Sequence, residues 1–503
     1  MSGRMKFVYN GLVLTLVGFA IRGVALFLGA YVAAAIGAEG MGLQGLIATV
    51  YSFAVTFATS GVSLSVTRLV AASIGEGKGS GYILRGAFTY ALCFGAVATG
   101  ILFIFADFIG AVILSDPRIA AALRILSLSL LPISLSAVIS GYFVAVRRGV
   151  LNAVVQISGQ IMRIGLTVYL LGRATGGISA SIRALALGVT VTEVVCLAIA
   201  FVEFFFDLTR HRGAVGSGNG LVEVSKMALP LAFSAYVRSF LLSVEHSLIP
   251  KRLVDRGNSR SEALTSYGYL GGMAIPIILF PMTPLTSFSG LLVPEFAQSE
   301  GEADTGRIER MASLAVEKAL VYAVIVSVFI LAFSEELGYV IYDTYEAGRY
   351  IGVLAPVIPI MYLDHVTDSM LKGIGEHVYS MWVNIADAFI SVILVWVLIP
   401  MLDIYGYALV IIIMECFNFL LSYLRLRKRI HFSFDIIRSL AVPLFASTIS
   451  VLLAKRVFVF CGSATKGFWL VMQMIFALCV CLFFIFCFEK ALKSRNDNAY
   501  LQK

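Results

Sequence analysis

The chain has very little charge for its length. Only 14% of its 503 residues are Asp, Glu, Lys or Arg, whereas 59% are hydrophobic, and the mean hydropathy is +0.92. A water-soluble domain does not carry so much apolar surface, and a disordered chain has the opposite composition. Apolar runs of about twenty residues recur along the whole sequence, which is typical of helices that cross a membrane. The composition therefore predicts an all-α polytopic membrane protein.

Motifs for ATP use, hydrolysis or metal binding are also missing from the sequence. It has no P-loop, no His-Glu-x-x-His and no Gly-x-Ser-x-Gly. The stretch 40–45 matches Gly-x-Gly-x-x-Gly, but no strand precedes it, so we interpret it as a tight turn before the second helix. The 7 cysteines fit neither a zinc site nor a disulfide framework. We therefore expect a protein that is not an enzyme, with no catalytic residue, no metal and no cofactor.

The positive charge of the chain is concentrated in loops. The net charge is +8, and the loops on the side of the N-terminus hold the excess of Lys and Arg, including Arg147, Arg148 and the run 425–429. The opposite loops are acidic around residues 335–346. Because basic loops stay in the cytoplasm, both termini are predicted to be cytoplasmic, and no nucleic-acid partner is needed to explain the charge.

Hydropathy predicts about fourteen transmembrane helices, and the sequence repeats itself. Arg68 and Glu295 each end an apolar run before a short polar linker, and Pro132 and Pro359 are separated by the same number of residues as this pair. We infer two parallel six-helix lobes plus two C-terminal helices. The predicted domains are an N-terminal lobe at 1–215, a C-terminal lobe at 216–430, and a two-helix segment with a cytoplasmic tail at 431–503. Transporters of this construction bind their substrate near the membrane midplane, where the repeats meet.

Arginines inside the apolar runs are the most informative polar residues. Arg22 and Arg238 occupy equivalent places in the two halves, and Arg68 lies near the end of the second helix. A guanidinium cannot lose its proton, so in a membrane it needs a carboxylate, water or an anionic ligand. We predict that Arg22 and Arg238 line a cavity and bind an anionic substrate, with structural ion pairing as the alternative. Arg68 would lie lower in the same cavity, and snorkelling to the membrane surface is the favoured interpretation for it.

A second polar group lies on the predicted fifth and sixth helices. Gln156 and Gln160 share one helix face, where their amides suit the hydroxyl groups of a sugar. Hydrogen bonds between helices are the alternative explanation for these amides. Arg163 and Glu193 lie on neighbouring helices, where they either form a structural ion pair or take part in function.

Several acidic residues in the apolar runs are candidates for coupling or gating. Asp364 and Asp368 are four residues apart and therefore lie on one helix face. Such carboxyls can repel one another, bind a monovalent cation or take up a proton. The full set of coupling or gating candidates is Glu245, Asp364, Asp368, Asp387 and Glu415.

Prolines inside the apolar runs predict places where helices change shape. Pro132, Pro281 and Pro359 each remove a backbone donor from a predicted helix. We expect kinks or breaks at these positions.

Longer stretches of the chain resemble a known family. Segments 36–43 and 61–71 are similar to the first two helices of the stage V sporulation protein B family, and segments 267–276, 280–284 and 291–297 resemble its eighth helix. Segment 371–376 resembles the loop that follows its tenth helix. These proteins are flippase-like exporters of polysaccharide or lipid II in the multidrug/oligosaccharidyl-lipid/polysaccharide exporter superfamily.

The resemblance implies two six-helix lobes around a central cavity, with a lipid-facing groove at the last two helices, in a bacterial plasma membrane. It implies movement of a polyprenyl-pyrophosphate-linked sugar from the inner to the outer leaflet, with the pyrophosphate on arginines that match Arg22, Arg68 and Arg238. Where relatives carry Asp late in the seventh helix, this chain has Glu245 followed by His246. The implied partners are this anionic sugar lipid, membrane lipids and enzymes of cell-envelope synthesis.

Two other functions fit the same sequence. The first is a cation-coupled multidrug antiporter of the same superfamily, which needs a cavity lined by acids rather than arginines. The second is a membrane partner of cell-wall or spore-coat enzymes that transports nothing, although buried charges are costly to keep without a use.

Overall fold

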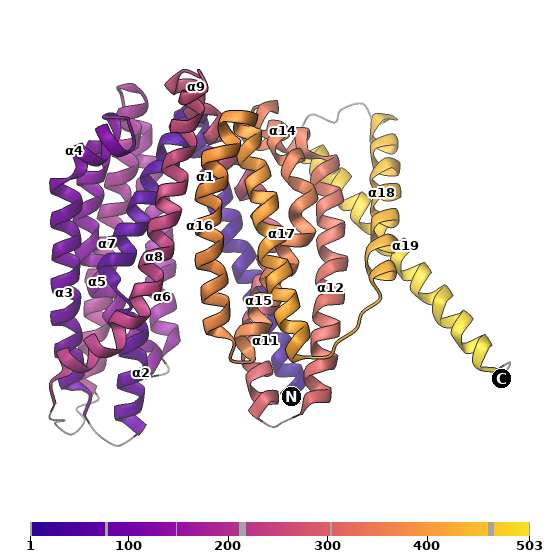
Figure 1. Cartoon of the computed structure of the whole chain (residues 1–503), viewed down its shortest axis with the longest axis horizontal. Coiled ribbons are helices and arrows are strands. Elements are labelled where there is room, and N and C mark those ends of the chain that lie inside the picture. Colours follow the sequence, from indigo (N-terminus) through magenta and orange to yellow (C-terminus); the bar gives the residue numbers. More distant parts are fainter. Residues whose placement is uncertain are drawn as a thin grey trace. The chain divides into compact units, whose positions relative to one another are not determined.

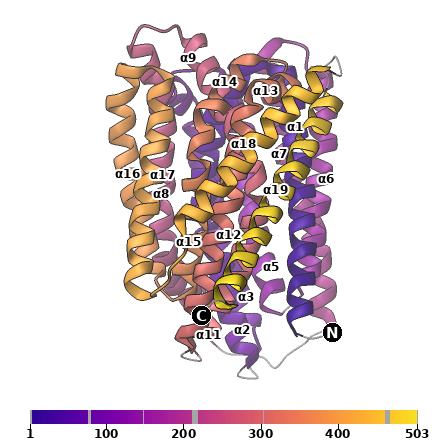
Figure 2. The same ribbon diagram turned by 90° about the vertical axis from the view of Figure 1, so that its right-hand side faces the viewer.

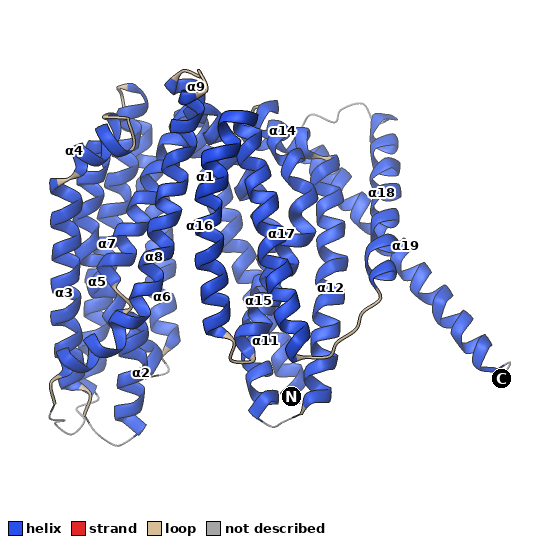
Figure 3. Cartoon of the chain, viewed as in Figure 1, coloured by secondary structure: helices blue, strands red, loops and turns tan. Residues whose placement is uncertain are grey.

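The computed structural model describes residues 3–75, 79–146, 148–210, 218–301, 304–460 and 467–501, with only the backbone described at some of these positions. Within these ranges the chain is helical and contains no strand (Figure 3). The described residues form 12 helices that are long and apolar enough to span a membrane, or up to 13 if a bent pair within 220–255 counts as one span. The prediction of an all-α polytopic membrane protein is confirmed.

The number of spans is slightly below the predicted one because the first two apolar runs form one helix. Helix α1 (Gly3–Thr59) continues through both runs and changes direction at Gly37, whose φ of 68° and ψ of −179° are not helical. Residues 40–45 are helical, so the turn predicted there was wrong. The change of direction lies at Gly37, where glycine adopts a positive φ without a steric penalty.

Contacts divide the chain into two compact units. Unit 1 comprises Met1–Ala34, Tyr269–Asp387 and Ile404–Lys503, and unit 2 comprises Ala35–Gly268 and Ala388–Asp403. The first part of α1 therefore packs with helices from the second half of the chain. The predicted lobes, by contrast, describe an internal repeat, and their boundaries stay a prediction.

Unit 2 contains the second part of α1 and most of the helices that follow it: α2 (Val62–Gly75), α3 (Gly81–Ile104), α4 (Ala106–Phe108), η1 (Ile109–Ile113), α5 (Arg118–Ala145), α6 (Gly149–Arg173), α7 (Gly177–Arg210), α8 (Gly220–Asp255) and α9 (Arg260–Tyr267). Helix α5 contacts α2, α3 and α7, and these helices run side by side (Figure 1). Pro132 lies inside α5, and the helix continues through it, so no break is present there. A kink at this proline stays a prediction.

The core of unit 2 follows the helical period of the sequence. On α2 the buried apolar side chains are Val62, Val66 and Val70, which recur every four residues and so share one face. They pack against equally spaced apolar residues of α3, α5, α7 and α8, among them Tyr90, Tyr142, Phe143 and Phe204. This packing fixes α5 and α7, which carry much of the polar pocket described below.

Close glycine contacts join α1 to α9. A Cβ atom at Gly42 would lie 2.1 Å from the Leu264 carbonyl oxygen, and one at Gly268 would lie 1.9 Å from that of Ala38. Any larger residue would force the two backbones apart. Small residues commonly provide such approaches between membrane helices.

Unit 1 contains the first part of α1 and the following elements: most of η2 (Gly268–Ala274), α10 (Ile275–Leu279), η3 (Phe280–Met282), α11 (Thr283–Gly301), α12 (Thr305–Ala332), α13 (Ser334–Tyr342), α14 (Tyr345–Leu354), η4 (Ala355–Val357), α15 (Ile358–Gly373), α17 (Ile404–Arg429), α18 (Ile436–Phe460) and α19 (Gly467–Leu501). Helix α16 (His377–Leu402) begins in unit 1 and ends in unit 2. Helix α15 contacts α11, α12 and α17, while α18 packs on α12 and is crossed obliquely by α19 (Figure 2).

Two of the predicted proline breaks are present in unit 1. Pro281 lies in the short 3-10 turn η3, which separates α10 from α11. Pro359 lies in the first turn of α15, directly after the 3-10 turn η4. Both helices therefore change geometry where a proline removes a donor.

An ionic cluster holds the turn between α15 and α16. Gly375 has a φ of 78°, and the Glu376 carboxylate accepts hydrogen bonds from Arg425 Nη2 at 2.8 Å and Arg429 Nε at 2.5 Å. These two guanidinium groups on α17 hold the pKa of the Glu376 carboxyl below its usual range, against the opposing effect of burial. The charged form of Glu376 therefore stabilises the folded state.

We expect Glu376→Gln to lower the melting temperature at neutral pH, by about 1 to 4 °C for a loss of about 1 kcal/mol or somewhat more. Because the folded pKa lies below the unfolded one, this contribution is present above the unfolded pKa. It is lost as the pH falls through the folded pKa. Thermal unfolding of purified wild type and variant across acidic and neutral pH measures the difference, which should vanish at the acidic end.

The matched control is Glu346→Gln, because Glu346 forms a surface ion pair with Arg349 in which both side chains are about half exposed. It should leave the melting temperature unchanged. Equal melting of wild type and Glu376→Gln at neutral pH would contradict the role given to this cluster.

Candidate functional site

The break between α10 and α11 leaves backbone carbonyls without helical donors. In the 3-10 turn, Thr283 N donates to Phe280 O, so the Leu279 carbonyl loses its usual partner. Arg22 Nη1 donates to that oxygen at 3.0 Å. The hydroxyl of Tyr362 donates to Ile278 O at 2.8 Å, and the hydroxyl of Tyr322 donates to Pro281 O at 2.6 Å. Arg22 thus satisfies a backbone oxygen while its charge meets no carboxylate among the described residues.

The other two predicted arginines lie in unit 2. Arg68 on α2 and Arg238 on α8 are both exposed, and neither has a hydrogen bond or ion pair to another residue within the described ranges. Two other cations on apolar helices are paired: Arg163 lies 2.7 Å from Glu193, and Lys455 lies 2.9 Å from Glu336. Arg238 therefore does not form, with any residue that the structure describes, the structural ion pair that was the alternative for it.

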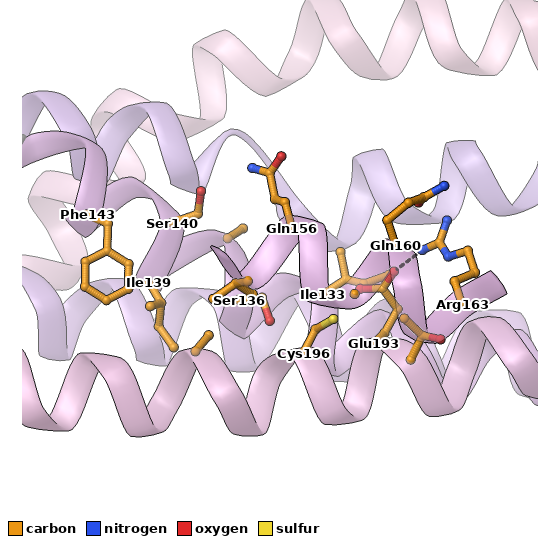
Figure 4. Close-up of a pocket in the computed structure, with 15 residues that line it drawn as sticks. Ile133, Ser136, Ile139, Ser140, Phe143, Gln156, Gln160, Arg163, Glu193 and Cys196 are labelled. Atoms are coloured by element: carbon orange, nitrogen blue, oxygen red, sulfur yellow. Dashed lines mark hydrogen bonds and ion pairs between the residues drawn. The ribbon is translucent and has the colours of Figure 1, made fainter. Parts of the chain in front are cut away.

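A polar pocket lies inside unit 2, between α5, α6 and α7. Its volume is about 420 Å³, and it is lined by both predicted glutamines, Gln156 and Gln160. The Arg163–Glu193 ion pair lies beside Gln160 at one end, and Phe143 lies at the other (Figure 4). The sequence therefore identified two of the polar residues of this pocket and the ion pair next to them.

Several polar atoms of this pocket lack partners. The amides of Gln156 and Gln160 make no hydrogen bond to another described residue, so the interhelical bonds that were their alternative explanation are not formed. Ser136 Oγ and Arg163 Nε are buried without a hydrogen-bond partner in the described structure. Buried polar groups normally have a protein or water partner, so these groups are available to a ligand or to solvent.

An acidic group lies in unit 1, at α15, α16 and α17. Asp364 and Asp368 lie on one face of α15, as predicted, and Asp368 pairs with Lys372 Nζ at 2.6 Å and accepts a hydrogen bond from Ser380. Asp364 Oδ1 and Asn418 Oδ1 are buried without a partner in the described residues. These side chains border a cavity of about 30 Å³, which is the space of roughly one water molecule.

The remaining predicted acids of unit 1 lie next to this cavity. The Glu415 carboxyl interacts electrostatically with those of Asp364 and Asp387. Charged carboxylates repel one another at such a place, so the group favours a bound proton or cation. Within the described residues, however, no group of three or more His, Cys, Asp or Glu side chains has the geometry of a metal site.

Glu245 belongs to a separate polar group in unit 2. Its side chain is buried, and the next residue, His246, shares a hydrogen bond of 2.8 Å with the hydroxyl of Tyr267. Arg238 is exposed although it lies on the same helix, so the two predicted residues of α8 differ in their surroundings.

Sequence reasoning missed the neutral polar members of these groups. On α16, Ser380, Asn384 and Asp387 recur at helical spacing, and the same holds for Glu415, Asn418 and Ser422 on α17. Ser136 and Ser140 form a similar pair on α5. Polar residues repeated every three or four positions in an apolar run would have identified each of them.

Comparison with known proteins gives the family. A family described as polysaccharide biosynthesis protein matches residues 7–299, and the MatE family matches residues 260–397. The chain is 25% identical over 427 residues to stage V sporulation protein B of Bacillus subtilis (strain 168). This alignment covers 82% of this chain and 80% of the relative.

Solved structures show the same fold. The lipid II flippase MurJ in an inward closed conformation aligns with a TM-score of 0.72 at 14% identity, covering 94% of this chain and 99% of that protein. An inward-facing multidrug resistance MATE family transporter of the MOP superfamily aligns with a TM-score of 0.66 at 16% identity, over 84% of this chain and 97% of the other. These relatives are transporters and flippases rather than enzymes, and they are membrane proteins. The chain thus belongs to the family described as polysaccharide biosynthesis protein, and it is a multi-pass membrane protein.

Proposed function

We propose that the protein is a flippase for a polyprenyl-pyrophosphate-linked oligosaccharide or a lipid II-like precursor of the cell envelope. It moves this lipid from the inner to the outer leaflet by alternating access, in which the two halves of a repeat rock around a fixed site. The name of the lipid II flippase MurJ, whose fold this chain shares, supports this class of substrate.

The observation that carries the proposal is the lack of carboxylate partners for the predicted arginines. Arg22, Arg68 and Arg238 keep their charge, but none forms an ion pair with a described residue. A pyrophosphate is the kind of anion that a planar guanidinium binds well, through paired charge-assisted hydrogen bonds. An anionic lipid would therefore supply the partner that the protein does not.

We further propose that the acidic group in unit 1 couples transport to a proton or monovalent cation. Asp364 is the central member, because one of its oxygens is buried without a partner and its carboxyl lies near Asp368, Asp387 and Glu415. Glu245 remains a second candidate for coupling or gating. Cytoplasmic termini and an association with envelope-synthesis enzymes stay predictions.

A cation-coupled multidrug antiporter is the second candidate function. The match of residues 260–397 to the MatE family favours it, because this region includes Asp364, Asp368 and Asp387. It differs from the flippase in its substrate, which would be a drug cation, and unpaired arginines would repel such a substrate.

We expect Arg68→Ala and Arg238→Ala to weaken binding of the pyrophosphate lipid by about tenfold or more, because each removes a charge-assisted hydrogen-bond donor. Native mass spectrometry of the purified proteins with added polyprenyl-pyrophosphate sugar measures retention of the lipid. Arg183→Ala is the matched control, since Arg183 on α7 is exposed and has no ion pair within the described ranges. Equal retention by wild type and both variants would reject the pyrophosphate role.

Arg22 needs a substitution that separates its charge from its hydrogen bond. Arg22→Gln removes the charge and leaves a shorter polar side chain, so it should lose lipid flipping in proteoliposomes while its melting temperature falls only slightly, by the loss of one hydrogen bond. Arg22→Lys, which keeps the charge, should retain part of the activity. Full activity in Arg22→Gln would make this arginine purely structural.

We expect Asp364→Asn to make flipping insensitive to a proton or sodium gradient and to slow it about tenfold or more, because an amide does not take up a proton. Proteoliposomes with imposed gradients measure this response. Asp343→Asn is the control, because Asp343 is exposed and has a φ of 55°, a conformation that asparagine tolerates. A wild-type gradient response in Asp364→Asn would contradict the coupling role.

A further inference from the structure

The pocket of unit 2 is electrically neutral although it contains a guanidinium. Arg163 Nη2 donates to Glu193 Oε1 at 2.7 Å, so the two charges cancel at the end of the pocket (Figure 4). An anion in the pocket would be repelled by the Glu193 carboxylate, and a cation would be repelled by the Arg163 guanidinium. The pocket therefore favours a ligand with no net charge.

The other polar groups of the pocket are donors and acceptors rather than charges. The free amides of Gln156 and Gln160 each offer both kinds of group, and Ser136 Oγ is buried with no partner among the described residues. Ser140 and Thr192 add hydroxyls to the lining. A ligand must therefore make several neutral hydrogen bonds in different directions.

The size and the apolar part of the pocket further restrict the class of ligand that it can bind. A volume of about 420 Å³ is far larger than a water molecule needs and lies within the range of small-molecule sites. Phe143, Ile133 and Ile139 line the apolar part. A pyranose ring has this same combination, with hydroxyls around its edge and C–H groups on its faces.

We infer that this pocket binds a neutral sugar unit, and that it recognises the glycan part of the transported lipid. The recognition of a glycan on a transported lipid rests on the proposed flippase function. In that function the anionic group of the lipid binds to arginines outside this pocket, while the neutral pocket selects among sugars. Gln156 and Gln160 are the specificity-determining residues, because they present unoccupied amides to the ligand.

Saturation-transfer difference NMR tests this inference on the purified full-length protein. The probes are N-acetylglucosamine, glucose and rhamnose at millimolar concentrations, with sodium pyrophosphate as competitor. We expect at least one sugar to bind, with its Kd raised about three- to tenfold in Gln156→Leu and in Gln160→Leu, since each loses neutral hydrogen bonds. Gln298→Leu, at an exposed position on α11, is the matched control and should bind like wild type.

Competition by an anion is a second test of the same pocket. Sodium pyrophosphate should not displace the sugar from wild type, but it should do so in Glu193→Gln, where Arg163 has lost its counter-charge. Displacement from wild type would mean that the pocket is an anion site and would overturn the inference. So would the absence of a signal from all three sugars, or sugar binding that neither glutamine substitution changes.

Failure of this inference is distinguishable from failure of the proposed function. Retention of the pyrophosphate lipid depends on Arg68 and Arg238, whereas binding of a free sugar depends on Gln156 and Gln160. Sugar binding that is unchanged in Arg238→Ala supports a separate pocket. Lipid retention that is equal in wild type, Arg68→Ala and Arg238→Ala, together with sugar binding that depends on the two glutamines, would reject only the pyrophosphate role. Lipid retention that depends on the arginines, together with no sugar binding by wild type, would reject only the pocket.

Discussion

A charge on an apolar membrane helix must be satisfied by protein, by water or by a ligand, and this constraint organises the polar residues of the molecule. Arg163 and Lys455 are satisfied within the protein by Glu193 and Glu336. Arg68 and Arg238 have no such partner among the described residues. The same residue type therefore serves two purposes, and only the partner distinguishes a structural cation from a candidate for binding.

The backbone is subject to the same constraint as the side chains. Where η3 interrupts the helix at Pro281, oxygens that lose their helical donors receive hydrogen bonds from Tyr322, Tyr362 and Arg22. Such a break is tolerated in a membrane because side chains from neighbouring helices replace the missing donors.

The class of fold could be predicted from the sequence because hydropathy alone reports which segments enter a membrane. Hydropathy could not predict that α1 continues past Gly37, because a kinked helix and a tight turn between two helices leave the same apolar pattern in the sequence. The arginines and acids were found as isolated charges in apolar runs. The serines and asparagines near them, such as Ser136 and Asn418, were missed because single neutral polar residues are common in such runs. Whether two charges pair depends on how the helices are rotated, which no single sequence specifies.

The cluster at Glu376 has a consequence for the order in which the protein is made. Glu376 lies in the turn before α16, whereas its partners Arg425 and Arg429 lie 49 and 53 residues later in the chain. A chain that emerges from its N-terminus carries this acidic turn well before the guanidinium groups exist. The hairpin of α15 and α16 is therefore made before Glu376 has its ion-pair partners. The ion pairs with Glu376 form only after the end of α17 has been made. The basic segment at the end of α17, which is predicted to lie in the cytoplasm, thus also completes the contacts of the helices that precede it.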